Sequence, residues 1–62
     1  MCEANAYIKR GEKEELVLEG VDIIRPEEGK LFLKSIFGEQ KILDSKIKLI
    51  SLIDHKIILE EN

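Results

Sequence analysis

The sequence predicts an all-β protein, a small, strongly bent barrel of the SH3-like or Sm-like type with about six or seven short strands. Short runs rich in Ile, Leu and Val recur along the 62 residues and are separated at close intervals by glycine and charged residues. No segment of 11 or more residues carries apolar residues at a clean helical spacing. At 7.1 kDa the chain is expected to form one domain over residues 1–62.

The first half of the chain is expected to contain three strands. The first, near 2–9 (CEANAYIK), ends before a Gly11 turn, where glycine can take a positive φ. The next two lie near 14–19 (EELVLE) and 21–25 (VDIIR), on either side of Gly20, which should mark a tight bend or a bulge. Pro26 and Gly29 are then expected to bracket a loop that contains Glu27 and Glu28.

The second half is expected to contain four more strands, near 30–36, 39–44, 47–53 and 57–61. Gly38 marks the turn after the first of them, although a helix over 34–38 remains possible. Asp54, His55 and Lys56 form a short hairpin connection between the last two, because an Asp side chain can accept hydrogen bonds from the backbone of a turn.

Strict alternation along each strand predicts the core. The candidates are Ala4, Ala6, Ile8, Leu16, Leu18, Leu31, Leu33, Ile47, Leu49, Ser51 and Ile53. The opposite faces of the strands are less polar than a simple two-layer pattern would make them. Ile50 and Leu52, for example, alternate with Leu49, Ser51 and Ile53 and so point to the other face. This surplus of apolar residues suggests a subunit interface.

Composition and charge exclude several classes of protein. Hydrophobic residues make up 44% of the chain and charged residues 37%, a mixture typical of a globular domain rather than a disordered one. The net charge of −3 argues against sequence-independent binding of nucleic acid, which depends on Lys and Arg contacts with phosphates. No run is long enough to cross a membrane, and the first residues do not resemble a secretory signal, so a cytoplasmic location is expected.

The only cysteine, Cys2, directly follows Met1. Removal of Met1 would leave an amine and a thiol on the same Cα, which can close a five-membered chelate ring around a metal. Two such termini, brought together at the axis of a homodimer, would supply two nitrogens and two sulfurs. This donor set suits planar Ni(II) or Cu(II). If Met1 is retained, its amine and the Cys2 amide nitrogen could serve with the thiolate. Met1 and Glu3 are counted as possible additional nitrogen donors.

Two other interpretations of these residues stay open. A lone cysteine at the start of a strand is commonly a small buried hydrophobic residue. His55, the only histidine, could join a metal site only if it reached the region of Cys2, and the turn alone already accounts for it. No paired acid and base, no phosphate-binding loop and no catalytic partner for Cys2 is evident, so an enzyme is not expected.

Three stretches of the chain resemble one known family. The opening MCEANAYIK, the central LFLKSIFGEQKIL and the closing IKLISLIDHKIILEE are similar to the CooT family of small nickel-binding accessory proteins of carbon monoxide dehydrogenase. Some members of that family have been labelled as predicted RNA-binding proteins. The resemblance covers essentially the whole chain, and Cys2 directly after the start methionine is its most specific element.

The resemblance implies a compact β-barrel homodimer that binds about one Ni(II) per dimer through Cys2. Such a protein would store nickel or deliver it to a nickel enzyme such as carbon monoxide dehydrogenase. The alternative function is a small RNA-binding or protein-interaction module that uses the barrel surface. The basic residues are interleaved with acidic ones and only three residues are aromatic, which disfavours RNA.

Overall fold

The structure, a computed structural model, describes residues 3–62. Six β-strands follow one another in the chain: β1 (Ala4–Arg10), β2 (Lys13–Glu27), β3 (Lys30–Ser35), β4 (Gln40–Leu43), β5 (Ser45–Ser51) and β6 (Lys56–Glu61). No helix occurs in this part of the chain, and residues 36–38 form a turn in place of the alternative helix over 34–38. The predicted all-β class is confirmed.

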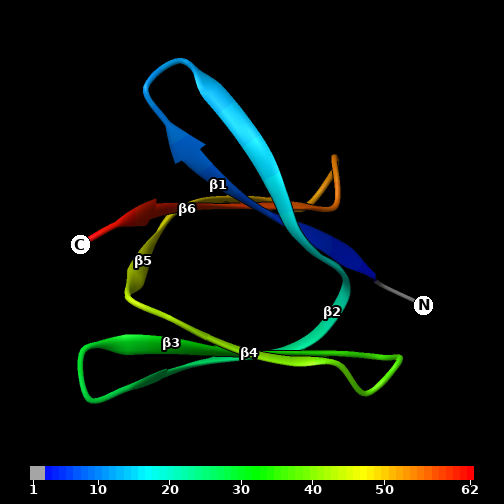
Figure 1. The fold of residues 1–62 in the computed structure, drawn as a ribbon. Coiled ribbons are helices and arrows are strands. Elements are labelled where there is room, and N and C mark those ends of the chain that lie inside the picture. The colour runs from blue at the N-terminus through cyan, green and yellow to red at the C-terminus, as the bar shows by residue number, and fades with distance from the viewer. Residues whose placement is uncertain (1–2) are drawn as a thin grey trace.

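The six strands form one sheet in the order β4-β3-β2-β1-β6-β5. Neighbouring strands are antiparallel except β1 and β6, which are parallel. The sheet curls so that β3 approaches β5, and the ribbon surrounds a central space in the manner of a half-closed barrel (Figure 1). This arrangement agrees with the predicted small bent barrel.

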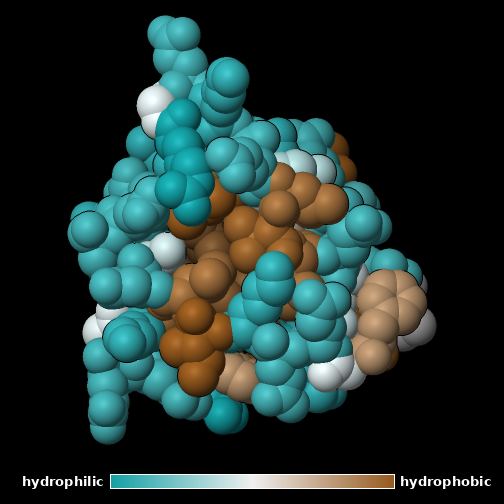
Figure 2. All heavy atoms as spheres, in the orientation of Figure 1, coloured by the Kyte–Doolittle hydropathy of each residue, from teal (hydrophilic) through white to brown (hydrophobic). Residues whose placement is uncertain are grey.

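The core fills the inside of the curl. It consists of Ala6, Ile8, Leu18, Val21, Leu31, Leu33, Ile57 and Leu59, all of them buried. Figure 2 shows apolar side chains gathered in the middle of the face seen in Figure 1, surrounded by hydrophilic ones. The core is therefore aliphatic, with no aromatic ring among its buried members.

The two strands predicted near 14–19 and 21–25 are in fact one long strand, β2. Gly20 has a φ of +63° and lies where the register of β2 against its neighbours shifts. The predicted bend at Gly20 is confirmed, but the backbone stays extended through it, because glycine takes the positive φ without steric cost. One half of β2 pairs with β1 and the other half with β3 (Figure 1).

The loop predicted between Pro26 and Gly29 is shorter than expected. Pro26 and Glu27 belong to β2, where they pair with Leu31 and Lys30. Only Glu28 and Gly29 form the turn, and both have a positive φ. Two such residues make the tight turn whose twist matches that of the flanking strands.

Part of the predicted core is exposed. Leu16 and Leu49 are each 50% exposed and Ile53 is 91% exposed, while Ile47 is 40% exposed. The physical reason for Leu16 and Leu49 is a pair of irregularities in strand register, one beside Leu16 and one between Ile47 and Leu49. Each extra residue moves the side chains that follow to the other face of the sheet.

Ile47 and Ile53, also predicted in the core, are exposed for other reasons. Ile47 faces inward opposite buried Leu59. Because β5 is an edge strand, it has a neighbouring strand on one side only, and Ile47 stays partly exposed. Ile53 lies beyond the end of β5, in the turn that precedes β6. No helix of residues 3–62 is long and apolar enough to cross a membrane.

Candidate metal centre

The predicted metal site falls at the first residues of the chain. Met1 and Cys2 lie outside the described residues. Glu3, the third candidate donor residue, is exposed and directly precedes β1. Glu3 and its neighbours are thus the described part of the chain that adjoins the predicted site.

Hydrogen bonds join two distant segments directly to Asn5 at the start of β1, and a third segment through Gly20. The Asn5 N–H donates to the His55 carbonyl oxygen over 2.9 Å, which holds the turn between β5 and β6 (52–55). The Gly20 N–H donates to Asn5 Oδ1 over 3.1 Å, and the Ile36 N–H donates to the Gly20 carbonyl oxygen over 2.8 Å. The bend of β2 and the turn between β3 and β4 (36–39) thus lie at the same end of the barrel as Glu3.

A cavity of about 280 Å³ opens beside Glu3. Its lining is mostly aliphatic and consists of Glu3, Ala4, Ile50, Ser51, Leu52, His55, Lys56 and Ile57. It lies between the start of β1 and the β5–β6 turn. An apolar wall of this kind would exclude water from one side of a group bound at the chain end.

His55 lies in the β5–β6 turn, as the sequence predicted. Its φ is +54°, its N–H bonds the Leu52 carbonyl oxygen over 3.4 Å, and its side chain is exposed. Histidine is one of the few residue types enriched at positive φ, so turn geometry explains its presence. The structure also places His55 on the same cavity as Glu3. Sequence reasoning missed this proximity, because it arises from the parallel pairing of β1 with β6.

The β3–β4 turn is held by a buried serine. Ser35, 1% exposed, accepts hydrogen bonds at Oγ from the Phe37 N–H and the Glu39 N–H, each over 3.1 Å. The turn also packs closely on Gly20, where a Cβ would lie 3.2 Å from atoms of both Ile36 and Phe37. Phe37 is therefore fixed at its backbone although its ring is 76% exposed.

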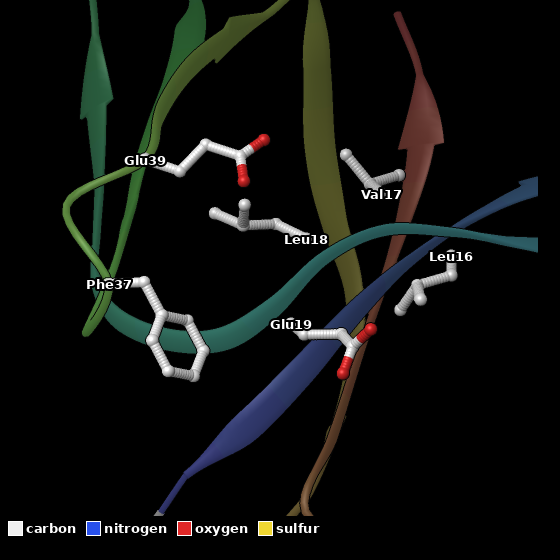
Figure 3. Close-up of a pocket in the computed structure, with 6 residues that line it drawn as sticks. All are labelled: Leu16, Val17, Leu18, Glu19, Phe37 and Glu39. Carbon is white, nitrogen blue, oxygen red and sulfur yellow. The ribbon is translucent and has the colours of Figure 1, made fainter.

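A second cavity, of about 300 Å³, lies between this turn and β2. In Figure 3, Phe37 and Glu39 come from the turn, and Leu16, Val17, Leu18 and Glu19 come from β2. The Lys41 ammonium donates to the Val17 carbonyl oxygen in the same region over 2.9 Å. Two carboxylates beside the most accessible aromatic ring would repel a phosphate backbone, which argues against RNA binding here.

The other two aromatic rings are already in contact with cations. The Arg25 guanidinium lies 4.7 Å from the centre of the Phe32 ring, and the Lys56 ammonium lies 4.9 Å from that of Tyr7. One face of each ring is thereby occupied. The structure thus offers no row of free aromatic faces among residues 3–62 on which RNA bases could stack.

An ion pair between Glu14 and Lys56 lies on the outside of the sheet and changes the pKa of both side chains. Lys56 Nζ lies 2.7 Å from Glu14 Oε1. The hydrogen bond from Lys56 lowers the pKa of Glu14, and the same bond raises the pKa of Lys56. Desolvation opposes both shifts but is the smaller effect.

No group of three or more His, Cys, Asp or Glu residues with the geometry to hold a metal ion occurs within residues 3–62. The hypothesis of a metal site therefore depends on Cys2.

Comparisons with known proteins agree with these features. The sequence model of CooT, described as a CO dehydrogenase accessory protein, matches residues 1–60. A crystal structure from Carboxydothermus hydrogenoformans, provisionally assigned to CooT, is 51% identical, covers 98% of each chain and superposes with a TM-score of 0.94. Among curated proteins, no significant match to the chain is found.

Proposed function

The chain belongs to the CooT family of CO dehydrogenase accessory proteins, and from this membership we propose that it binds Ni(II) and stores it for, or delivers it to, a nickel enzyme. An accessory role implies an enzyme partner, with carbon monoxide dehydrogenase as the first candidate. The protein itself is proposed to be a carrier rather than a catalyst.

The observation that carries this proposal is the position of the only thiol. Cys2 stands directly after Met1 and one residue before Glu3, which lies at an exposed end of the barrel. A thiolate is a soft ligand, and next to an amine or amide nitrogen it forms five-membered chelate rings that favour Ni(II) or Cu(II) in planar geometry. The chemistry of Cys2 thus fits nickel without help from any other side chain.

The proposed site is completed by a second copy of the chain. One chain supplies one thiolate and its neighbouring nitrogen, whereas planar nickel takes four donors, so a homodimer with one Ni(II) is the simplest stoichiometry. An ion held at chain ends remains accessible to the ligands of a receiving protein. Such access suits delivery, since transfer requires an entering ligand to approach the metal.

The test is a nickel titration of tag-free protein, with Cys2→Ser as the matched variant. We expect thiolate-to-nickel charge-transfer absorption in the near ultraviolet that saturates at about one Ni(II) per two chains. Native mass spectrometry of the same samples gives the stoichiometry and shows whether Met1 is present. Equal nickel binding by Cys2→Ser would refute the proposal.

A further inference from the structure

The Tyr7 ring forms a group of three with a cation and a carboxylate. The Lys56 ammonium lies 4.9 Å from the centre of this ring and 2.7 Å from Glu14 Oε1. The face of the ring and the carboxylate both attract positive charge. The Lys56 cation is thus bound from two sides.

The Phe32 ring forms a second group of the same composition. The Arg25 guanidinium lies 4.7 Å from the centre of this ring, and Arg25 Nε donates to Glu27 Oε2 over 2.8 Å. The chain has one Tyr and two Phe residues and no Trp. Two of its three aromatic rings therefore contact a cation that a carboxylate also binds.

The third ring, that of Phe37, has two carboxylates beside it. Glu19 and Glu39 line the same cavity as this ring, and Figure 3 shows the three side chains around Leu18. Within residues 3–62 neither carboxylate forms an ion pair, and no Lys or Arg lies over the Phe37 ring. The chain therefore supplies the ring and the carboxylates of such a group but not the cation.

Lys41 lies in the same region and is bound to the backbone instead. Its ammonium donates to the Val17 carbonyl oxygen over 2.9 Å. Val17 is the extra residue between Leu16 and Leu18 at the irregularity of β2, and Lys41 gives its carbonyl oxygen a hydrogen-bond partner. The role of Lys41 is thus to hold β4 against β2.

We propose that the cavity between β2 and the β3–β4 turn binds an arginine or lysine side chain of a partner protein. The Phe37 ring lies against the cation, and Glu19 and Glu39 bind it, which repeats the composition of the groups at Tyr7 and Phe32. This inference goes beyond the proposed function, because it assigns a contact with a second protein and does not depend on nickel. The enzyme partner that an accessory role implies is the first candidate to present such a side chain.

The lining of the cavity suits a long cationic side chain better than a bare metal ion. Leu16, Val17 and Leu18 form an aliphatic wall, against which the methylene groups of arginine or lysine can pack. The volume of about 300 Å³ has room for one such side chain. A metal ion would need more donors, and residues 3–62 hold no group of three or more His, Cys, Asp or Glu side chains that could bind one.

The cavity is accessible, and its carboxylate and ring are attached to a fixed turn. Ser35 Oγ accepts hydrogen bonds from the N–H groups of Phe37 and Glu39, and the Phe37 ring is 76% exposed. The lining continues along β2 to Leu16, which pairs with Tyr7 in the middle of β1, so the cavity extends along the side of the barrel. A surface that is already held in place loses little freedom when a partner binds.

The test is a titration of the isotope-labelled full chain with two blocked tripeptides, followed by the NMR shifts of its backbone amides at constant ionic strength. One peptide carries arginine between two glycines, and the other carries citrulline, which has a similar shape without the charge. The test variant combines Glu19→Gln with Glu39→Gln. The control variant combines Glu12→Gln with Glu28→Gln, since these two glutamates are exposed, lie outside the cavity and form no ion pair within residues 3–62.

We expect the arginine peptide to bind the unchanged chain saturably, with the largest shifts at Phe37 and Glu39. The citrulline peptide should bind at least about fivefold more weakly, and the test variant should weaken arginine binding by about the same factor, because both remove two ion pairs. The control variant has the same net charge as the test variant and should change the dissociation constant by less than about twofold. Phe37→Leu should raise it about two- to fivefold, because leucine keeps an apolar contact but removes the aromatic face.

Absence of saturable binding by the arginine peptide would overturn the inference. Equal affinities for the two peptides, or equal losses in the test and control variants, would also overturn it. Light scattering of the same variants examines a rival occupant, a second copy of the chain. Loss of association between two copies in the test variant alone would show that a second chain fills the cavity, and the inference would be wrong.

The nickel titration with Cys2→Ser tests the proposed function separately. Nickel binding that depends on Cys2, in a chain that does not bind the arginine peptide, would refute only the inference about the cavity. Arginine binding at the cavity, in a chain whose nickel binding does not depend on Cys2, would refute only the nickel site.

Discussion

Gly20 is the residue at which the start of β1, the bend of β2 and the β3–β4 turn come together. Its φ of +63° favours glycine, and its backbone bonds both Asn5 and Ile36. A methyl group there would lie 3.2 Å from side-chain atoms of Ile36 and Phe37. Gly20 therefore serves both the bend of the strand and the position of the Phe37 turn.

We predict that Gly20→Ala lowers the free energy of unfolding by about 1–3 kcal/mol, from the positive φ and from the close contacts together. Chemical denaturation followed by circular dichroism measures this. Gly11→Ala is the matched control, because Gly11 has a φ of +64° and nothing within 4 Å of the added methyl. The loss of unfolding free energy in Gly11→Ala measures the effect of the positive φ alone. Equal losses at both positions would show that the contacts with Ile36 and Phe37 do not affect stability.

The Glu14–Lys56 pair makes stability depend on pH in a defined direction. Because the pKa of Glu14 is lowered on folding, its contribution is fully present above the ordinary pKa of 4.5 and is lost as pH falls through the lowered value. Because the pKa of Lys56 is raised, its contribution is fully present below 10.5 and is lost as pH rises through the raised value. Both side chains are partly exposed, so the effects should be small.

We predict that Glu14→Gln flattens the acid side of the curve of unfolding free energy against pH, relative to the unchanged chain. Lys56→Gln should flatten the alkaline side of the same curve. It should also flatten the acid side, since either substitution breaks the Glu14–Lys56 ion pair. Denaturant titrations at several pH values in constant salt supply the curves. Acid-side slopes that are identical in all three proteins would show that the pair does not couple to folding.

At the scale of the elements, irregularities in strand register decide which apolar residues enter the core. Leu18 pairs with Ala6 and is 4% exposed, whereas Leu16 pairs with Tyr7 on the outer face and is 50% exposed. Perfect alternation would place both leucines on one face. The extra residue between them, Val17, separates them onto opposite faces.

This arrangement predicts unequal costs for the same substitution. Leu18→Ala should destabilise the protein by about 2–4 kcal/mol, since it leaves a cavity in the core. Leu16→Ala should cost less than about 1 kcal/mol, since water already reaches that side chain. Urea unfolding of the two variants measures the difference, and similar losses would contradict the register of β1 against β2.

Strand positions were predictable from sequence to within a few residues, because glycine and charged residues mark the turns locally. Which side chains face the core was predictable only where a strand is regular. Leu31 and Leu33 in β3 are examples, and both are buried as expected. In β5 the register shifts between Ile47 and Leu49, so Leu49 does not face the core as strict alternation predicted. Whether a strand carries a bulge depends on how its neighbours pair, and that information is not local.

At the scale of the whole molecule, the small size of the barrel limits the stability that a single chain can reach. A chain of 62 residues hides a smaller share of its surface than larger domains do. Several large apolar side chains of residues 3–62 remain exposed, most of all those of Phe37, Leu52 and Ile53. Association of two copies, as proposed for the metal site, would bury part of the exposed surface and stabilise the folded state.

We therefore predict that the thermal midpoint rises with protein concentration in the absence of metal, by several degrees over a hundredfold range. The reason is mass action, since a folded dimer is favoured over unfolded monomers as concentration increases. Differential scanning calorimetry or fluorescence at a series of concentrations tests this. A midpoint that stays constant in the unchanged chain would argue against a dimer that contributes to stability.

The sequence by itself determined the all-β class, most of the turns and the singular position of Cys2, because each depends on residue types within a few positions of one another. Only the tertiary structure decided that Glu3, His55 and Phe37 gather at one end of the barrel. The parallel pairing of β1 with β6 brings together residues about fifty positions apart, and the bend at Gly20 carries β3 and its turn back to the start of β1. Such long-range proximity follows from the closing of the whole sheet, which no local pattern of residues records.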